Sequence, residues 1–156
     1  MACTHYGDLS MGVAVNLTDA IKAKLEETTF GTATVERQLV PKVARKDLGQ
    51  LIIVALQGKA SVEQDRGGEW IEYRIGIGLS YPTNSIADQE SGLNMAEDIQ
   101  DWISLKANRL ITTVDGEFCL VPPFDMDNVF DPEQVNAAGV MFCISNFNYR
   151  FYKDRT

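Results

Sequence analysis

The residues that carry most enzyme chemistry are scarce in this chain. It has one histidine, His5, and three cysteines, Cys3, Cys119 and Cys143, with no CxxC spacing among them. Nucleophilic catalysis by serine or cysteine usually needs a histidine base that the fold holds in place. His5 lies in a stretch without periodicity, and together with Cys3 it offers only two of the four ligands of a structural zinc site. We therefore expect no enzyme activity, no cofactor and no metal centre.

Carboxylates supply one further candidate site. Four of them fall close together in the C-terminal third of the chain: Asp125, Asp127, Asp131 and Glu133. In a calcium loop that starts at Asp125, the glycine position would hold Phe130 and the bidentate glutamate position Asn136, so this motif fails. The pattern favours a solvated acidic loop, and a cation site of another kind stays open.

The size and charge of the chain exclude several classes of protein. Its 156 residues, 45% hydrophobic and 23% charged, suit one globular domain with an ordinary core. The net charge of -8 argues against a surface that neutralises nucleic-acid phosphates. The odd cysteine count indicates a reduced, cytosolic setting. Without a recognisable signal peptide or an apolar run near the roughly 20 residues of a membrane span, we expect no membrane partner.

The first half of the chain predicts a helix and then strands. Residues 1–14 are expected to form a flexible arm, and residues 15–156 a single domain. Asn16 is a suitable N-cap for a helix that ends near Gly31. The alternating segment Thr32–Val40 is typical of a strand.

A hairpin is expected next. The apolar run Leu51–Leu56 predicts a strand covered on both faces, and Trp70–Tyr81 alternates clearly. The polar segment Gly58–Glu69 between them is expected to be a long loop. Gly76 and Gly78 would leave a flat strip on the second strand, open to a helix or another backbone.

The second half predicts another helix and a long last strand. Ser85 begins a capping box for a helix that runs to about Asn108, and Glu117–Val121 is a short strand. In the last strand, Val140–Tyr152, the apolar alternation slips near Asn146, which indicates either a β-bulge or a strand with two covered faces. The predicted fold class is α+β, with a mainly antiparallel sheet of about four to five strands and two helices packed against it.

Several of these segments together match a known pattern. They are the run Val35–Lys42, the apolar strand Leu51–Leu56, the polar hairpin, the strand Trp70–Ile77, and the turn Phe130–Glu133 before an alternating strand that ends in Tyr149-Arg150. From about residue 15 to residue 152, the chain resembles the tail terminator proteins of tailed bacteriophages.

The resemblance implies a virion structural protein that forms a ring, usually of six copies, at the head-proximal end of the tail tube. The ring would stop tube polymerisation and join the tail to the neck or head. The implied partners are other copies of the chain, the tail tube protein and a neck or head-completion protein, with assembly in the host cytoplasm. DNA would pass through the ring without specific binding, because an acidic wall repels phosphates.

Three regions are candidates for contacts within this assembly. Those in the polar hairpin, which would reach the tube or the neck, are Lys59, Glu63, Asp65, Arg66 and Glu69. Those in the loop that follows Pro122 are Phe124, Asp127, Phe130 and Asp131. The two phenylalanines suit an aromatic anchor and ordinary core packing equally well. The N-terminal arm would lie on an adjacent subunit.

Other assignments stay open at this point. A neck or head-tail joining protein would belong to the same assembly, and so would a tail tube subunit, which would polymerise alone. From a different class, a small soluble α+β binding module would be a monomer or dimer with an apolar pocket.

Overall fold

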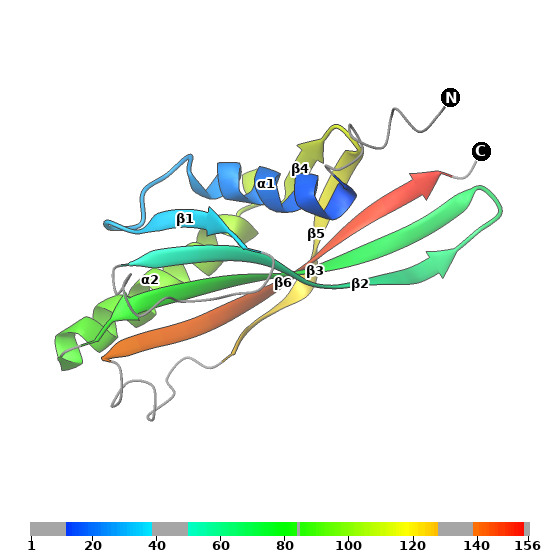
Figure 1. Ribbon diagram of the computed structural model, residues 1–156. Coiled ribbons are helices and arrows are strands. Elements are labelled where there is room, and N and C mark those ends of the chain that lie inside the picture. The colour runs from blue at the N-terminus through cyan, green and yellow to red at the C-terminus, as the bar shows by residue number, and fades with distance from the viewer. Residues whose placement is uncertain (1–11, 39–49, 84, 128–138, 155–156) are drawn as a thin grey trace.

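A computed structural model describes residues 12–38, 50–83, 85–127 and 139–154 (Figure 1). The elements are α1 (Val13–Leu25), β1 (Thr34–Arg37), β2 (Leu51–Gln64), β3 (Gly68–Pro82), α2 (Ile86–Ser104), the 3-10 turn η3 (Lys106–Asn108), β4 (Leu110–Thr113), β5 (Gly116–Asp127) and β6 (Val140–Asp154). The strands form one sheet in the order β1-β2-β3-β6-β5-β4.

The expected sheet of four to five mainly antiparallel strands is wrong. The sheet has six strands and is mixed, because β1 pairs with β2 in parallel while the other neighbouring strands are antiparallel. The parallel pair is possible because β1 ends at Arg37 and β2 starts only at Leu51, and a parallel return needs a connection of about a dozen residues or more. The short strand β4 has too few residues to show a period, so the sequence did not predict it.

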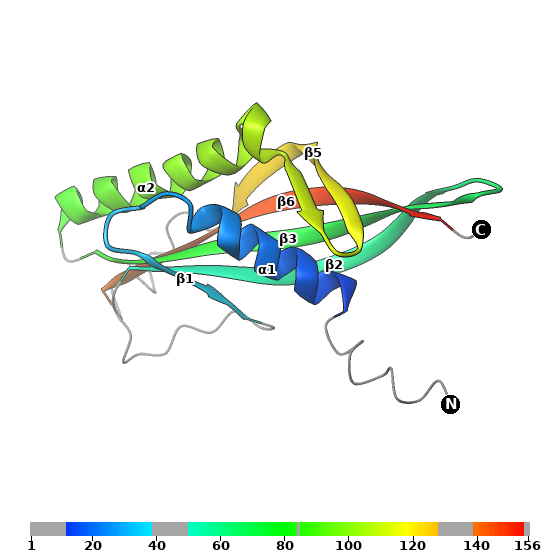
Figure 2. The same cartoon turned by 90° about the horizontal axis from the view of Figure 1, so that it is seen from above.

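Both helices cover one face of the sheet (Figure 2). The buried residues of α1 are Leu17, Thr18, Ile21 and Leu25, and those of α2 are Gly92, Met95, Ala96, Ile99 and Ile103. They pack on core residues of the central strands, among them Ile52, Ile75, Ile77, Leu79 and Phe147. This apolar layer holds the helices on the sheet, since burying such side chains stabilises by about 1.5–3 kcal/mol each.

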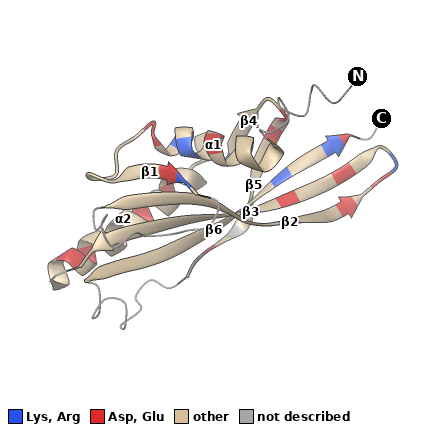
Figure 3. Cartoon of the chain, in the orientation of Figure 1, with Lys and Arg blue, Asp and Glu red and all other residues tan. Residues whose placement is uncertain are grey.

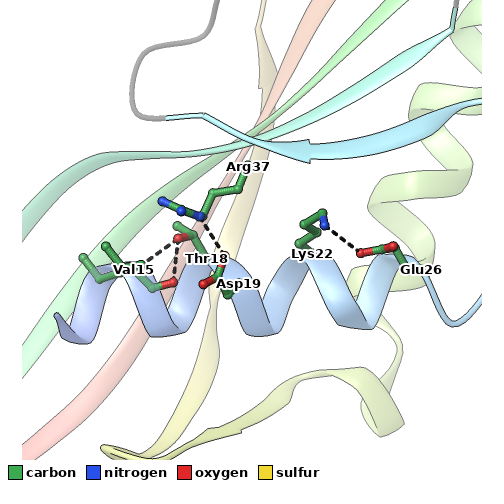
Figure 4. Close-up of polar contacts among 7 residues, drawn as sticks. Val15, Thr18, Asp19, Lys22, Glu26 and Arg37 are labelled. Carbon is green, nitrogen blue, oxygen red and sulfur yellow. Dashed lines mark hydrogen bonds and ion pairs between the residues drawn. The ribbon is translucent and has the colours of Figure 1, made fainter. Parts of the chain in front are cut away.

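Polar contacts attach α1 to its neighbours. Asp19 accepts from Arg37 of β1 at 2.7 Å (Figure 4). Asn16 donates to Asp115, in the turn between β4 and β5, at 2.9 Å. The prediction that Asn16 caps the helix is wrong, because the N-cap is Gly12 and α1 already begins at Val13. The amide of Asn16 serves a tertiary contact, which a single sequence does not reveal.

The start of α2 follows the prediction. Ser85 is the N-cap, and its hydroxyl accepts from the backbone N–H of Asp88 at 3.2 Å. The helix itself ends at Ser104, and the 3-10 turn η3 continues to Asn108, where the predicted helix ended.

Strand β6 has no bulge against its neighbour β3. The pairing is continuous from Val140, opposite Pro82, to Asp154, opposite Gly68. Met141, Cys143 and Phe147 therefore belong to the core on the helix side, and the even-numbered residues Phe142 and Ile144 face the other side. The slip in alternation near Asn146 reflects two apolar faces of one regular strand, so the predicted bulge is wrong.

Strand β5 is longer than predicted. It continues through Pro122 and Pro123 to Asp127, with a register shift against β6 between Val121 and Asp125. Proline lacks the N–H that a strand ladder needs, and an irregular stretch is where a strand tolerates it. The two prolines therefore mark the irregularity and do not end the strand.

Candidate interaction surface

Three strands extend past the helices and form a projecting ribbon (Figure 1). This ribbon is here called the arm and is a different element from the N-terminal arm expected at residues 1–14. It consists of residues 58–64 of β2, 68–74 of β3 and 148–154 of β6, which pair with one another, and of the turn 65–67 at its tip. The prediction of a loop over Gly58–Glu69 is wrong, because only residues 65–67 lie between β2 and β3. The segment looked like a loop because residues 59–64 of β2 are all exposed, which removes the alternation that marks a half-buried strand.

Two irregularities interrupt the pairing of β2 with β3, one at the base of the arm and one within it. The register of β2 against β3 shifts between Leu56 and Gly58 and again between Ser61 and Glu63. Bulges of this kind bend a strand and increase its twist. The side chain of the extra residue Gln57 occupies the space where a Cβ at Gly76 would lie. The arm therefore begins at a β-bulge of β2, where the strand bends.

Among the described residues, the strip at Gly76 and Gly78 receives neither a helix nor another backbone. A Cβ at Gly76 would meet Gln57, and one at Gly78 would meet the ring of Phe142 at 2.9 Å. The prediction of a flat strip open to another element is therefore wrong at these two positions, because side chains of the same sheet cover them.

The tip of the arm is held by one carboxylate. Asp65 accepts from the backbone N–H groups of Gly67 at 2.8 Å and Gly68 at 2.7 Å, and from the hydroxyl of Tyr152 at 3.0 Å. These hydrogen bonds, that from Gly68 first, hold the pKa of Asp65 below its ordinary value. The same contact raises the pKa of Tyr152. The turn is thus preorganised and presents the exposed side chain of Arg66 at its apex.

One face of the arm, here called the outer face, points away from the helices. Ile71 and Tyr73 of β3 belong to the core, so the alternate residues Trp70 and Glu72 point the other way. Trp70 is 39% exposed and meets the ring of Tyr152 edge-on at 5.2 Å. Beside them, Arg150 donates to Glu72 at 3.0 Å. Aromatic side chains and arginine are the residue types most enriched in protein interfaces.

The opposite face of the arm merges with the core. Phe118 of β5 stacks on Phe151 at 4.7 Å and meets Tyr73 edge-on at 5.9 Å. Tyr149 is fully buried there, its hydroxyl has no hydrogen-bond partner among the described residues, and burial raises its pKa. The amino group of Lys59 lies over the ring of Tyr73 at 5.7 Å. This face is anchored, so the outer face and the tip are the surfaces left for a partner.

The structure brings together only part of the predicted site. Five of the nine predicted residues lie on the arm: Lys59, Glu63, Asp65, Arg66 and Glu69. Phe124 is half-buried on β5, and its ring centroid lies 5.7 Å from that of Phe147, so Phe124 packs against the core. Asp127 ends β5, and its side chain is outside the described part, as are Phe130 and Asp131.

The sequence reasoning missed the outer face. It assigned Trp70–Tyr81 to a strand but did not read the polar positions of that strand as a surface. The available signal was Trp70, a large aromatic residue in phase with charged Glu72 and out of phase with apolar Ile71 and Tyr73. Trp70 meets Tyr152 and Glu72 pairs with Arg150, each about 80 residues away in the chain, and only the strand pairing brings them together.

The described part of the chain was also compared with what a ligand pocket, a metal site or a membrane span requires. One cleft of about 320 Å³ opens beside α2, lined by residues that include Phe30, Tyr81, Asn94, Met95 and Asp98. No three potential metal ligands cluster among the described residues. None of the described helices has the length and apolarity needed to cross a membrane.

Comparison with known proteins gives the fold but no family. No protein-family model matches the chain, and no curated protein matches it. Among solved structures, a chain of the virion of a native gene transfer agent particle matches with a TM-score of 0.53 and 18% identity, over 91% of this chain and 98% of that one. A second structure, of a protein known only by a sequence identifier, matches with a TM-score of 0.58 and 10% identity, over 94% and 95%. Nearly the whole chain thus has a fold that also occurs in a phage-like virion.

Proposed function

We propose that this chain is a virion structural protein that forms a ring at the head-proximal end of a phage-type tail. In this role it stops the growth of the tail tube and offers a surface to the neck or head. The observation that carries the proposal is the fold shared with a component of a gene transfer agent virion, which covers both chains almost end to end.

Features of the molecule suit an assembly role. The arm is a preformed element that projects from the body and carries exposed aromatic and charged groups. The described part of the chain has no cluster of three potential metal ligands. The net charge of -8 suits a ring through which DNA slides, because phosphates bind where cations neutralise them.

Deletion of the gene from the phage or prophage that encodes it tests the role directly. We expect overlong tails without heads beside full heads in negative-stain electron microscopy of the lysate. Complementation with the intact gene, supplied on a plasmid, should restore normal particles and serves as the control. Intact virions in the deletion strain would contradict the proposal.

The same images separate this role from its neighbours in the assembly. Tails of normal length that fail to join heads would assign the chain to the neck, and the absence of any tube would make it a tube or initiation component. The purified protein gives a second criterion, since a terminator forms closed rings and does not polymerise into long tubes. Native mass spectrometry measures the number of copies directly.

A further inference from the structure

Strand β4 forms one of the two edges of the sheet, and among the described residues only β5 pairs with it. The N–H of Leu120 donates to the carbonyl of Arg109 at 2.9 Å, just before β4 begins. In an antiparallel pair every second residue exchanges hydrogen bonds with the partner strand, so the residues alternate from Arg109 onward. The N–H and C=O groups of Leu110 and Thr112 therefore point away from β5, toward the free edge.

This free edge lacks most of the features that keep sheet edges from pairing. Natural edge strands are short, or they carry lysine, proline, inward charges or a bulge. Strand β4 is short, but it reads Leu-Ile-Thr-Thr, has no charged residue (Figure 3) and no shift in its register. Leu110 is 48% exposed, and Val114 in the following turn is 91% exposed. The edge thus offers backbone groups beside apolar side chains, which is what a sheet needs to accept an added strand.

The arm has a free edge of its own on the opposite side of the sheet. Strand β1 pairs with β2 only at residues 51–54, so along the arm β2 is the outermost described strand. Between its two register shifts, β2 pairs regularly from Gly58 to Ser61, over four residues as in β4. We call the segment Gly58–Ser61 the arm edge. Val62, the extra residue at the second shift, follows it and is 42% exposed.

Exposed apolar side chains concentrate near these two edges. Six large hydrophobic residues of the described chain are exposed: Leu105, Leu110 and Val114 in the stretch that includes β4, Val62 and Trp70 on the arm, and Ile86 at the start of α2. The arm carries both signs of charge (Figure 3), so its net charge does not select a partner. Backbone pairing and apolar area are what the two edges have in common.

We propose that the arm edge of one copy adds as a strand to the free edge of β4 in the next copy, with Val62 brought to Leu110 and Val114. Within one copy the two edges do not pair, because β3, β6 and β5 lie between β2 and β4. A contact between two different edges joins copies head to tail, the geometry that closes into a ring. This pairing rests on the ring of the proposed function and names the surfaces that build it.

A proline in β4 tests the contact in the full-length protein. Thr112→Pro removes an N–H that points to the free edge, a position at which an edge strand tolerates proline. Thr112→Val keeps the N–H, suits a strand and is the matched control. We expect Thr112→Pro to weaken ring formation about tenfold or more in native mass spectrometry, and the control to assemble like the wild type. Circular dichroism of each variant checks that the fold is intact.

A lysine on the same edge gives a second variant that leaves the backbone unchanged. Leu110→Lys places a charge beside the free backbone groups, as natural edge strands do, and should weaken ring formation as well. The matched control is Ile86→Lys, which makes the same change at an apolar side chain that is 74% exposed on α2. We expect this control to assemble like the wild type.

Cross-linking identifies the partner of β4. One variant carries Ser61→Cys and another Thr112→Cys, both in a background with Cys3→Ser and Cys119→Ser, so that the buried Cys143 is the one other thiol. Neighbouring strands lie about 5 Å apart. A short bismaleimide reagent should therefore join the two variants when they assemble together, and should join neither variant to itself.

The outcomes separate this inference from the proposed function. If the wild type forms rings and both Thr112→Pro and Leu110→Lys form them equally well, the ring stands and the pairing is refuted. Cross-linking of Thr112→Cys with itself, or no cross-link in mixed rings, would refute the arm edge as the partner of β4. If the wild type stays monomeric at every concentration and in assembling virions, the ring itself is wrong, and the contact falls with it.

Discussion

Strand β2 belongs to two different environments along its length. Residues 51–55 are buried between neighbouring elements, while residues 59–64 are exposed, although the same strand β3 pairs with both parts. The change falls at Gln57, the extra residue of the first register shift. Backbone pairing alone therefore does not decide what a strand buries; the helices and strands packed on its faces do.

The difference between body and arm also concerns how each is held together. The body relies on apolar burial under α1 and α2, which is cooperative and large in sum. The arm shares this core on its inner face through Ile71, Tyr73 and Tyr149. Its tip and outer face rely on the Asp65 carboxylate, one ion pair and an aromatic pair, each of which contributes about 1 kcal/mol or less near water. A tip and an outer face held by small local terms suit a surface that gains its final stability from a partner.

Removal of an aromatic side chain from each region should give the largest difference in the free energy of unfolding. Phe147→Ala in the body should lower the free energy of unfolding by about 3–5 kcal/mol, because the ring is fully buried against the helices. Trp70→Ala in the arm should cost only about 1 kcal/mol, since the ring is 39% exposed. Urea unfolding followed by circular dichroism measures both. Equal losses would show that the arm belongs to the same cooperative core.

A glycine substitution should loosen the arm alone. A Cβ at Gly68 would collide with the carbonyl oxygen of Lys153 and the ring of Tyr152, so Gly68→Val should separate β3 from β6 at a cost of about 1–3 kcal/mol. Hydrogen exchange should then speed up in the arm and stay unchanged in the body. The matched control is Gly58→Val, because a Cβ at Gly58 meets nothing within 4 Å. Similar exchange in both variants would contradict the prediction.

Replacing tyrosine by phenylalanine should change the free energy of unfolding in opposite directions at two positions of β6. The buried hydroxyl of Tyr149 lacks a partner among the described residues, so Tyr149→Phe should leave stability unchanged or raise it by up to about 1 kcal/mol. Tyr152→Phe removes the hydrogen bond to Asp65 and should cost about 0.5–1 kcal/mol. Thermal unfolding at one pH compares the pair. A large loss for Tyr149→Phe would reveal a hydrogen bond that the described residues do not supply.

The smallest expected effect is a local titration at the tip. The hydrogen bonds to Asp65 lower its pKa in the folded state, so its carboxylate stabilises the turn above the ordinary value of 3.8, and this contribution is lost as pH falls through the lower folded value. In a pH titration by NMR, the amide signals of Gly67 and Gly68 should shift with a midpoint below 3.8. Asp65→Asn should abolish that shift. A midpoint at or above 3.8 would contradict the hydrogen bonds described here.

The elements with strong periodicity could be predicted from the sequence. The alternation of Trp70–Tyr81 predicted β3, and the Ser85 cap with its apolar stripe predicted α2. Both signals are local, because they depend on neighbours two to four residues apart. Segments without a local period were predicted wrongly: the arm part of β2 as a loop, β4 not at all, and β5 as ending at its prolines.

The candidate surface was likewise predictable only where its signal is local in the sequence. Charged residues around 59–69 were predicted as contacts from their polarity, but their strand conformation was not. The pair Trp70 and Tyr152, and the ion pair of Glu72 with Arg150, join segments about 80 residues apart. A single sequence contains no signal for such pairs, because only the register of β3 against β6 places them opposite each other.

The sequence by itself determined that this is an acidic chain with a single histidine, two helices and a clear central strand. These properties follow from composition and from the periods of 2 and 3.6 residues, which local geometry imposes. Only the tertiary structure decided that the sheet has six strands in mixed order, that a polar segment extends into an arm, and which side chains meet on it. Those features depend on pairing between distant segments, where burial and register are set by whichever elements pack on each face.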